Sequence, residues 1–147
     1  MQSLLNKRHN YAVYLCEPET DAAFAQQVSK TRKTDANNDM HGGEYETSVL
    51  LYFRPDLMQM NRAATESGAD QKRLNLPNLY TPIWWYARYP NHYAGEGAAA
   101  TTKLGQLMGE HEIKAFTDML RTVKADANTL KLQNEYYDKV DNLGKNQ

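Results

Sequence analysis

The apolar residues between positions 98 and 123 recur with the period of an α-helix, and this pattern constrains the fold more than any other feature of the sequence. They are Leu104, Leu107, Met108, Ala115, Phe116, Met119, Leu120 and Val123. Residues three and four positions apart lie on one face of a helix, so the spacing predicts a long helix with one wide buried face. A further helix is expected from Asn128, a capping residue, to Val140, ahead of a polar tail at residues 144–147.

The segments before this helix alternate between strand and helix patterns. Residues 11–16, YAVYLC, are a short run of β-forming residues that predicts a buried strand. Residues 21–29 and 44–53 begin with a capping or acidic residue and continue with apolar residues, which predicts two short helices. The aromatic segment 79–89, LYTPIWWYARY, predicts a strand or an extended segment. This alternation predicts an α/β fold in layers, and the length of 147 residues predicts one domain.

Charge and cysteine content narrow the classes of function. The chain has 17 Lys and Arg against 18 Asp and Glu, so no basic surface is available to gather phosphates and we expect no nucleic-acid partner. Cys16 is the only cysteine and cannot form an internal disulfide, so a reducing, cytoplasmic location is expected. No segment reaches the ~20 apolar residues of a membrane-spanning helix, and residues 1–10 do not resemble a signal peptide.

Residues 41–48, HGGEYETS, are the segment richest in chemistry, because a histidine, two glycines and two glutamates fall within eight positions. Adjacent glycines allow a sharp turn or a close approach to a ligand. His41 is then placed to move protons near neutral pH, and Glu46 could bind a hard metal or orient a water. A simple turn with two glutamates at a helix N-terminus explains the same residues. The sequence shows no complete metal site, since it has no His-Glu-x-x-His and no cysteine pair.

A second feature is the aromatic run Trp84, Trp85 and Tyr86. Such a cluster can cap a substrate pocket, or it can pack in a core or against another subunit. The surrounding tyrosines favour packing, and both readings stay open.

The sequence resembles the creatininase family in two segments. HGGEYETS followed by VLLYFRPDL is similar to the family pattern of His, Ala or Gly, Gly, two variable residues and Glu-Thr-Ser, which leads through a helix to Pro-Asp-Leu. Residues 89–105, YPNHYAGEGAAATTKLG, look like the downstream segment, in which a glycine-rich turn precedes a helix. With the strand predicted at residues 11–16, the resemblance covers residues 11–125.

The resemblance implies an α/β fold with a creatininase-like sheet and flanking helices, and an amidohydrolase that cleaves C–N amide bonds, often in cyclic substrates, with a Zn or Mn centre. It also implies that His41 transfers protons beside the metal and that Glu46 is a metal ligand or a direct neighbour of one. Glu44 stands at a variable position of the motif and receives no role.

The chain departs from the family pattern at the other metal ligands. Those ligands come from an early Glu-x-His segment, a nearby Asp and an Asn-Gly-His segment, all expected before the strand at residues 11–16. We therefore expect a sheet that is incomplete on its N-terminal side, with residues 126–147 as an extra helix and tail. His9 and His92 lie in no matching motif and are expected in surface or turn positions, and His111 is expected on a solvated helix face.

Three functions are compatible with these observations. The chain could supply the C-terminal part of an amidohydrolase site that a missing N-terminal half or a further copy in a homo-oligomer completes. It could instead be a truncated family member that acts as a non-catalytic assembly or binding module, or an unrelated α/β binding protein. An incomplete sheet would leave apolar surface exposed, so we expect the isolated chain to self-associate or to be marginally stable.

Overall fold

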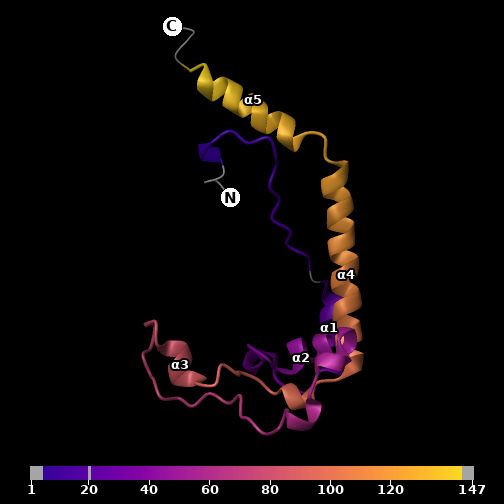
Figure 1. The fold of residues 1–147 in the computed structure, drawn as a ribbon, viewed down its shortest axis with the longest axis vertical. Helices are drawn as coiled ribbons and strands as arrows, with labels where there is room; N and C mark the ends of the chain where they lie inside the picture. The colour runs from indigo at the N-terminus through magenta and orange to yellow at the C-terminus, as the bar shows by residue number, and fades with distance from the viewer. Residues whose placement is uncertain (1–4, 20, 144–147) are drawn as a thin grey trace. The chain divides into compact units, whose positions relative to one another are not determined.

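The structure is a computed structural model that describes residues 5–19 and 21–143, and its regular elements are helices (Figure 1). The α-helices are α1 (Ala22–Thr31), α2 (Glu44–Phe53), α3 (Trp84–Arg88), α4 (Thr102–Ala125) and α5 (Thr129–Asp141). Short 3-10 helices lie between them: η2 (Ala36–Asn38), η3 (Pro55–Leu57), η4 (Met60–Arg62) and η5 (Gly97–Ala99). The predicted tail at residues 144–147 lies outside the described residues.

The expected α/β fold in layers with a creatininase-like sheet is wrong for the part of the chain that the structure describes. The described residues form no strand, and their only β-type pairing is one isolated antiparallel bridge between His41 and Ala94. Residues 11–16, predicted as a buried strand, form no regular secondary structure and leave Tyr11, Val13 and Leu15 exposed. β-forming residues need a neighbouring strand to complete their hydrogen bonds, and strand propensity alone does not supply one.

The predicted helices are confirmed, because their signals are local. The Asp21 carboxylate accepts a hydrogen bond of 2.6 Å from the backbone N–H of Phe24 and so caps α1. Helix α2 ends at Phe53, two residues before Pro55, which cannot continue a helix. Helix α4 extends over 24 residues, as its apolar period predicts. Residues 84–88 form the short helix α3 inside the segment predicted to be extended, so that prediction is wrong there.

By their contacts the described residues fall into two compact units, and α4 contributes to both. One unit holds the described residues of Met1–Glu19 and Lys114–Gln147, and there Arg8 forms an ion pair of 2.6 Å with Asp138 while the Tyr14 hydroxyl donates to Asp126 at 2.6 Å. The other unit holds those of Thr20–Ile113 and contains the HGGEYETS segment. The expectation of a single domain over residues 1–147 stays a prediction.

In the Thr20–Ile113 unit, helix α4 packs closely on α2. A Cβ atom on Gly105 would lie 1.9 Å from the carbonyl oxygen of Ser48, so only glycine fits this crossing. Ser48 is buried, and its hydroxyl accepts from the backbone N–H of Thr101 at 2.9 Å, just before α4 begins. His111 stacks on Phe24 of α1 with ring centroids 3.5 Å apart, so its expected place on a solvated face is wrong. These contacts fix the position of α2, whose first turn carries the motif.

The described residues bury little apolar surface. Their buried hydrophobic side chains are Tyr89, Ala94, Leu104 and Tyr137. Many large apolar side chains are exposed, among them Ile113, Phe116 and Leu120 of α4. No helix in the described part of the chain has the length and apolar character that crossing a membrane requires.

Candidate functional site

The loop before α2 is held by the turn that precedes η5. The backbone N–H of His41 donates to the carbonyl of Ala94 at 2.9 Å, and the N–H of Ala94 donates back to the carbonyl of His41 at 3.0 Å. Gly42 follows with φ of +66°, a left-handed conformation that favours glycine, and faces the ring of Tyr93. The two segments that resemble the creatininase family are thus joined at His41.

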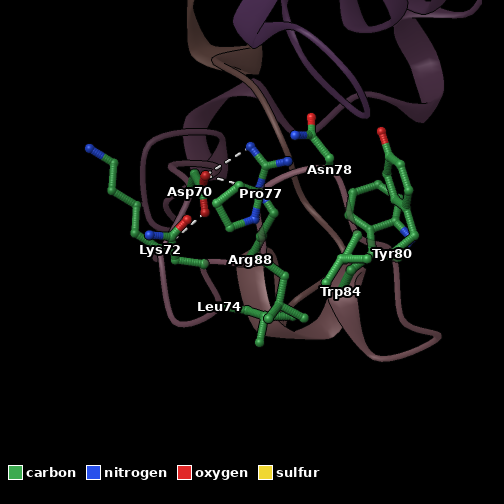
Figure 2. Close-up of a pocket in the computed structure, with 11 residues that line it drawn as sticks. Asp70, Lys72, Leu74, Pro77, Asn78, Tyr80, Trp84 and Arg88 are labelled. Atoms are coloured by element: carbon green, nitrogen blue, oxygen red, sulfur yellow. Dashed lines mark hydrogen bonds and ion pairs between the residues drawn. The ribbon is translucent and has the colours of Figure 1, made fainter.

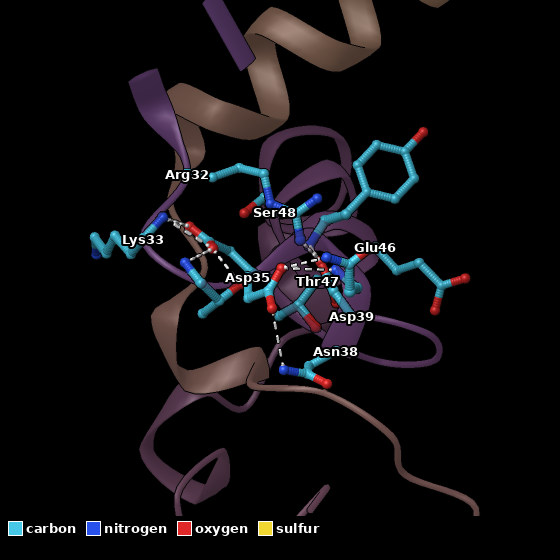
Figure 3. Close-up of polar contacts among 12 residues, drawn as sticks. Arg32, Lys33, Asp35, Asn38, Asp39, Glu46, Thr47 and Ser48 are labelled. Atoms are coloured by element: carbon cyan, nitrogen blue, oxygen red, sulfur yellow. Dashed lines mark hydrogen bonds and ion pairs between the residues drawn. The ribbon is translucent and has the colours of Figure 1, made fainter. Parts of the chain in front are cut away.

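The acidic side chains of Asp39 and Glu44 are buried beside this loop, and Figure 3 shows polar contacts in this region. The Asp39 carboxylate is 3% exposed, accepts from the backbone N–H of Tyr45 at 2.9 Å, and pairs with Arg32 at 2.5 Å. It supplies the cap that Gly43 cannot provide at the N-terminus of α2. A Cβ atom on Gly43 would lie 1.5 Å from the Asp39 carboxylate, so the second glycine of the motif is required for this close approach.

Glu44 is fully buried, although its place in the motif gave it no role. Its carboxylate accepts hydrogen bonds from the backbone N–H groups of Lys33 and Thr34, at 2.8 to 3.0 Å, and from the Thr34 hydroxyl at 2.7 Å. Burial raises the pKa of Glu44, but these hydrogen bonds and the charge of Arg32 outweigh burial and lower it. Glu44 therefore ties the segment after α1 to the first turn of α2 as a carboxylate.

Glu46, two residues on, points away from the buried cluster, as Figure 3 shows. Its Oε2 accepts from the backbone N–H of Gly42 at 2.7 Å and lies 3.5 Å from Nδ1 of His41. Both side chains are half exposed, at 48% for His41 and 53% for Glu46. The structure thus brings together the two residues that the motif singled out, at a position open to a small molecule.

A second histidine lies beside His41. The ring centroids of His41 and His92 are 4.8 Å apart at an interplanar angle of 70°, and the indole N–H of Trp85 donates to Nδ1 of His92 at 2.8 Å. His92 was expected in a surface or turn position, and it does occupy a turn, with φ of +63°. The sequence did not predict that His92 lies beside His41, because 51 positions separate the two residues and the bridge between His41 and Ala94 brings them together.

The family model for creatininase, described as creatinine amidohydrolase, matches residues 1–120 of the 147. The chain belongs to the creatininase family. This family consists of metal-dependent amidohydrolases, so the chain is related to hydrolases. No curated protein and no solved structure matches it.

The described residues contain no group of three or more His, Cys, Asp or Glu side chains that could hold a metal ion. The motif implies one ligand among them, Glu46, whereas a catalytic zinc site takes three protein ligands and a structural site four.

Three cavities lie in the unit that contains the motif, and the motif lines one of them. The first, of about 700 Å³, is shown in Figure 2 and has Trp84, Tyr80 and Pro77 among its walls, with an Arg88–Asp70 ion pair of 2.8 Å at one side. That hydrogen-bonded pair lowers the pKa of Asp70. Neither His41 nor Glu46 lines this cavity, so it is separate from the motif.

The cavity that the motif lines, of about 560 Å³, shares Gly42 and Thr47 with the HGGEYETS segment. Its other walls include Met58, Met60 and Tyr93, which are half buried. Cavities that bind small molecules combine apolar walls with a few polar groups, and this one has both kinds. It is therefore the cavity that the motif itself helps to form.

Proposed function

We propose that this chain supplies part of the catalytic site of a creatininase-type, metal-dependent amidohydrolase that cleaves the C–N amide bond of a small substrate, cyclic amides included. His41 is the proton-transfer residue and Glu46 a ligand of a divalent metal, Zn or Mn. The remaining ligands come from an N-terminal half supplied separately or from another copy in a homo-oligomer. The single cysteine, Cys16, suits a reducing compartment, and we place the protein in the cytoplasm.

One observation carries this proposal: the imidazole of His41 and the carboxylate of Glu46 lie 3.5 Å apart inside the family motif. A neutral imidazole that directs its Nδ1–H at a carboxylate has an unprotonated Nε2, which can accept a proton. Cleavage of an amide requires one proton removed from the attacking water and one delivered to the leaving nitrogen. His41 is open to solvent beside the motif cavity and is positioned to carry both.

The buried residues support this role by holding the loop in place. Asp39 caps α2 and Glu44 anchors its first turn, so the exposed His41 and Glu46 project from a fixed backbone. A site of this kind needs its groups held within about 0.5 Å of the productive geometry. The motif thus combines two buried acids that support the loop with two exposed residues that are free to act.

The test is divalent-metal affinity and amide hydrolysis of the purified 147-residue chain, alone and with its native assembly partners. Glu46→Gln keeps the size of the side chain and an acceptor for Gly42 but removes the charge, and we expect about 10- to 100-fold weaker metal binding. His41→Gln should leave metal affinity within about twofold and lower kcat by about 10² to 10⁴. Metal affinity that is identical in the original and Glu46→Gln would contradict the proposed ligand.

A second function, a non-catalytic assembly or binding module, is favoured by the absence of a three-ligand cluster in the described residues. The large exposed apolar surface would then serve to bind another polypeptide. The two functions predict different results for the native assembly. An assembled module binds no metal at Glu46 and hydrolyses no amide, whereas the enzyme loses both properties through separate substitutions.

A further inference from the structure

We propose that His92 and Trp85 are positioning residues that hold the imidazole of His41 in a single orientation. The inference rests on the proposed function, because it assigns two further residues to the same site. Neither belongs to the part of the motif that contains His41 and Glu46, and the chain folds back to bring them there.

Hydrogen-bond chemistry fixes the state of His92. The indole nitrogen of Trp85 can only donate, so Nδ1 of His92, at 2.8 Å, has to be the acceptor. A neutral His92 therefore carries its proton on Nε2 and exists as one tautomer. The ring of His92 also meets the Trp85 ring at 5.5 Å and 64°, so one neighbour fixes both its tautomer and its plane.

The fixed ring of His92 in turn faces His41. The two imidazoles meet nearly edge to face, at 4.8 Å and 70°, and the Trp85 ring lies 6.3 Å from His41 at 72°. Edge-to-face ring contacts of this kind shift a rotamer population by a factor of about 2 to 12. His41 is half exposed, and its Nδ1 contact with Glu46 is long at 3.5 Å, so these ring contacts are needed to limit its rotation.

His92 lies in a turn with φ of +63°, a left-handed conformation that histidine adopts more often than most residues other than glycine. The N–H of His92 donates to the carbonyl of Tyr89 at 3.0 Å, which closes the turn. This turn holds the exposed ring of His92 beside Trp85 and His41.

The experiment is ¹⁵N-edited NMR of the histidine side chains in the full 147-residue chain, at about pH 8.5, where unperturbed imidazoles are neutral. In the original chain, Nδ1 of His92 should show the shift of an unprotonated nitrogen, and His41 should populate one χ1 rotamer. Trp85→Phe keeps a ring but removes the donor, so the His92 tautomers should average. Trp84→Phe is the matched control: Trp84 lines the cavity in Figure 2 and meets the Trp85 ring edge to face at 5.3 Å, so phenylalanine keeps a ring against Trp85 and should change neither signal.

A second variant separates the ring from the turn. His92→Asn retains a residue that tolerates positive φ and an oxygen that can accept from Trp85, but it removes the ring that faces His41. The χ1 rotamers of His41 should then average, while the dispersion of the backbone amide spectrum stays unchanged. A single His41 rotamer in His92→Asn, or averaged His92 tautomers in the original chain, would overturn the proposal.

Catalysis provides the second readout in the active assembly. Trp85→Phe should lower kcat by about 3- to 10-fold and leave KM and metal content unchanged, because it alters only the orientation of His41. If the NMR changes occur but His41→Gln hydrolyses amides normally, the proposed catalytic role fails and the positioning of His41 stands. If His41→Gln is inactive and Trp85→Phe retains full kcat, the positioning proposal fails and the catalytic role stands.

Discussion

Replacing the buried Glu44 by glutamine should weaken the fold more than the same replacement at the exposed Glu46. The amide oxygen of glutamine can retain the bonds that Thr34 and Lys33 make to Oε2, but its NH₂ group then replaces Oε1 and points a donor at the Lys33 N–H, which donates to Oε1 at 2.9 Å and to Oε2 at 3.0 Å. One hydrogen bond to a charged group is worth about 1.5–3 kcal/mol, so we expect a loss of about 2–3 kcal/mol. For a unit of this size that lowers Tm by about 10 °C or more.

The effect of Glu44→Gln on the free energy of unfolding should depend on pH. The pKa of Glu44 is lowered in the folded state, so its contribution is present above the ordinary carboxyl pKa of about 4.3 and is lost as pH falls through the lower folded value. The difference in unfolding free energy between the original chain and Glu44→Gln should be largest near pH 7 and shrink in acid.

Urea unfolding followed by circular dichroism, from about pH 7 down to pH 3, measures this difference. Glu46→Gln is the matched control, because its carboxylate is 53% exposed and its loss should cost under about 0.5 kcal/mol. Equal effects of the two substitutions would refute the reasoning, and so would a Glu44→Gln effect that acid leaves unchanged.

Three further predictions concern packing, ionisation and assembly. Gly105→Ala should lower the free energy of unfolding, measured in urea, by about 2–3 kcal/mol, because its Cβ would lie 1.9 Å from a backbone oxygen. Gly109→Ala should change it by no more than about 1 kcal/mol, because its Cβ would meet mainly the outer atoms of the Phe53 ring and alanine has the higher helix propensity. Burial, and then the hydrogen bond to Glu112, raise the pKa of Tyr45. Its contribution to the free energy of unfolding is therefore complete below about pH 10 and is lost as pH rises through the raised pKa. Unfolding followed by circular dichroism should show a shallower loss of stability in alkali for Tyr45→Phe than for the original chain. Sedimentation equilibrium should show the isolated chain self-associating as its concentration rises; a stable monomer at every concentration would contradict this.

The sequence predicted helices well and strands poorly, for a physical reason. Helix signals such as the Asp21 cap and the apolar period of α4 act between residues a few positions apart, so they operate in any surroundings. A strand requires a partner, and segment 11–16 has none among the described residues. The predicted sheet therefore failed although its β-forming residues were identified correctly.

For the site, too, the sequence predicted the local geometry and not the contacts between distant segments. His41 and Glu46 are close because five positions across a turn and a first helical turn bring them together, and a local motif encodes that geometry. Of the two glutamates, the motif gave no role to Glu44, and only the structure shows the carboxylate anchored by Lys33 and Thr34. His92 could be found only through the pairing of His41 with Ala94, which no local pattern specifies.

We propose that one partner accounts for two observations on the described residues, their lack of a three-donor group and their few buried apolar side chains. A catalytic zinc site takes three protein ligands, and the described residues contain no group of three donors. Their buried apolar residues are Tyr89, Ala94, Leu104 and Tyr137. A second polypeptide that packs on the exposed apolar side chains would remedy both deficits at once, because ligands carried on it would be held by the same burial. On this view metal binding and assembly are coupled: adding the metal should tighten the association, and a substitution at Glu46 should weaken it without touching the apolar surface.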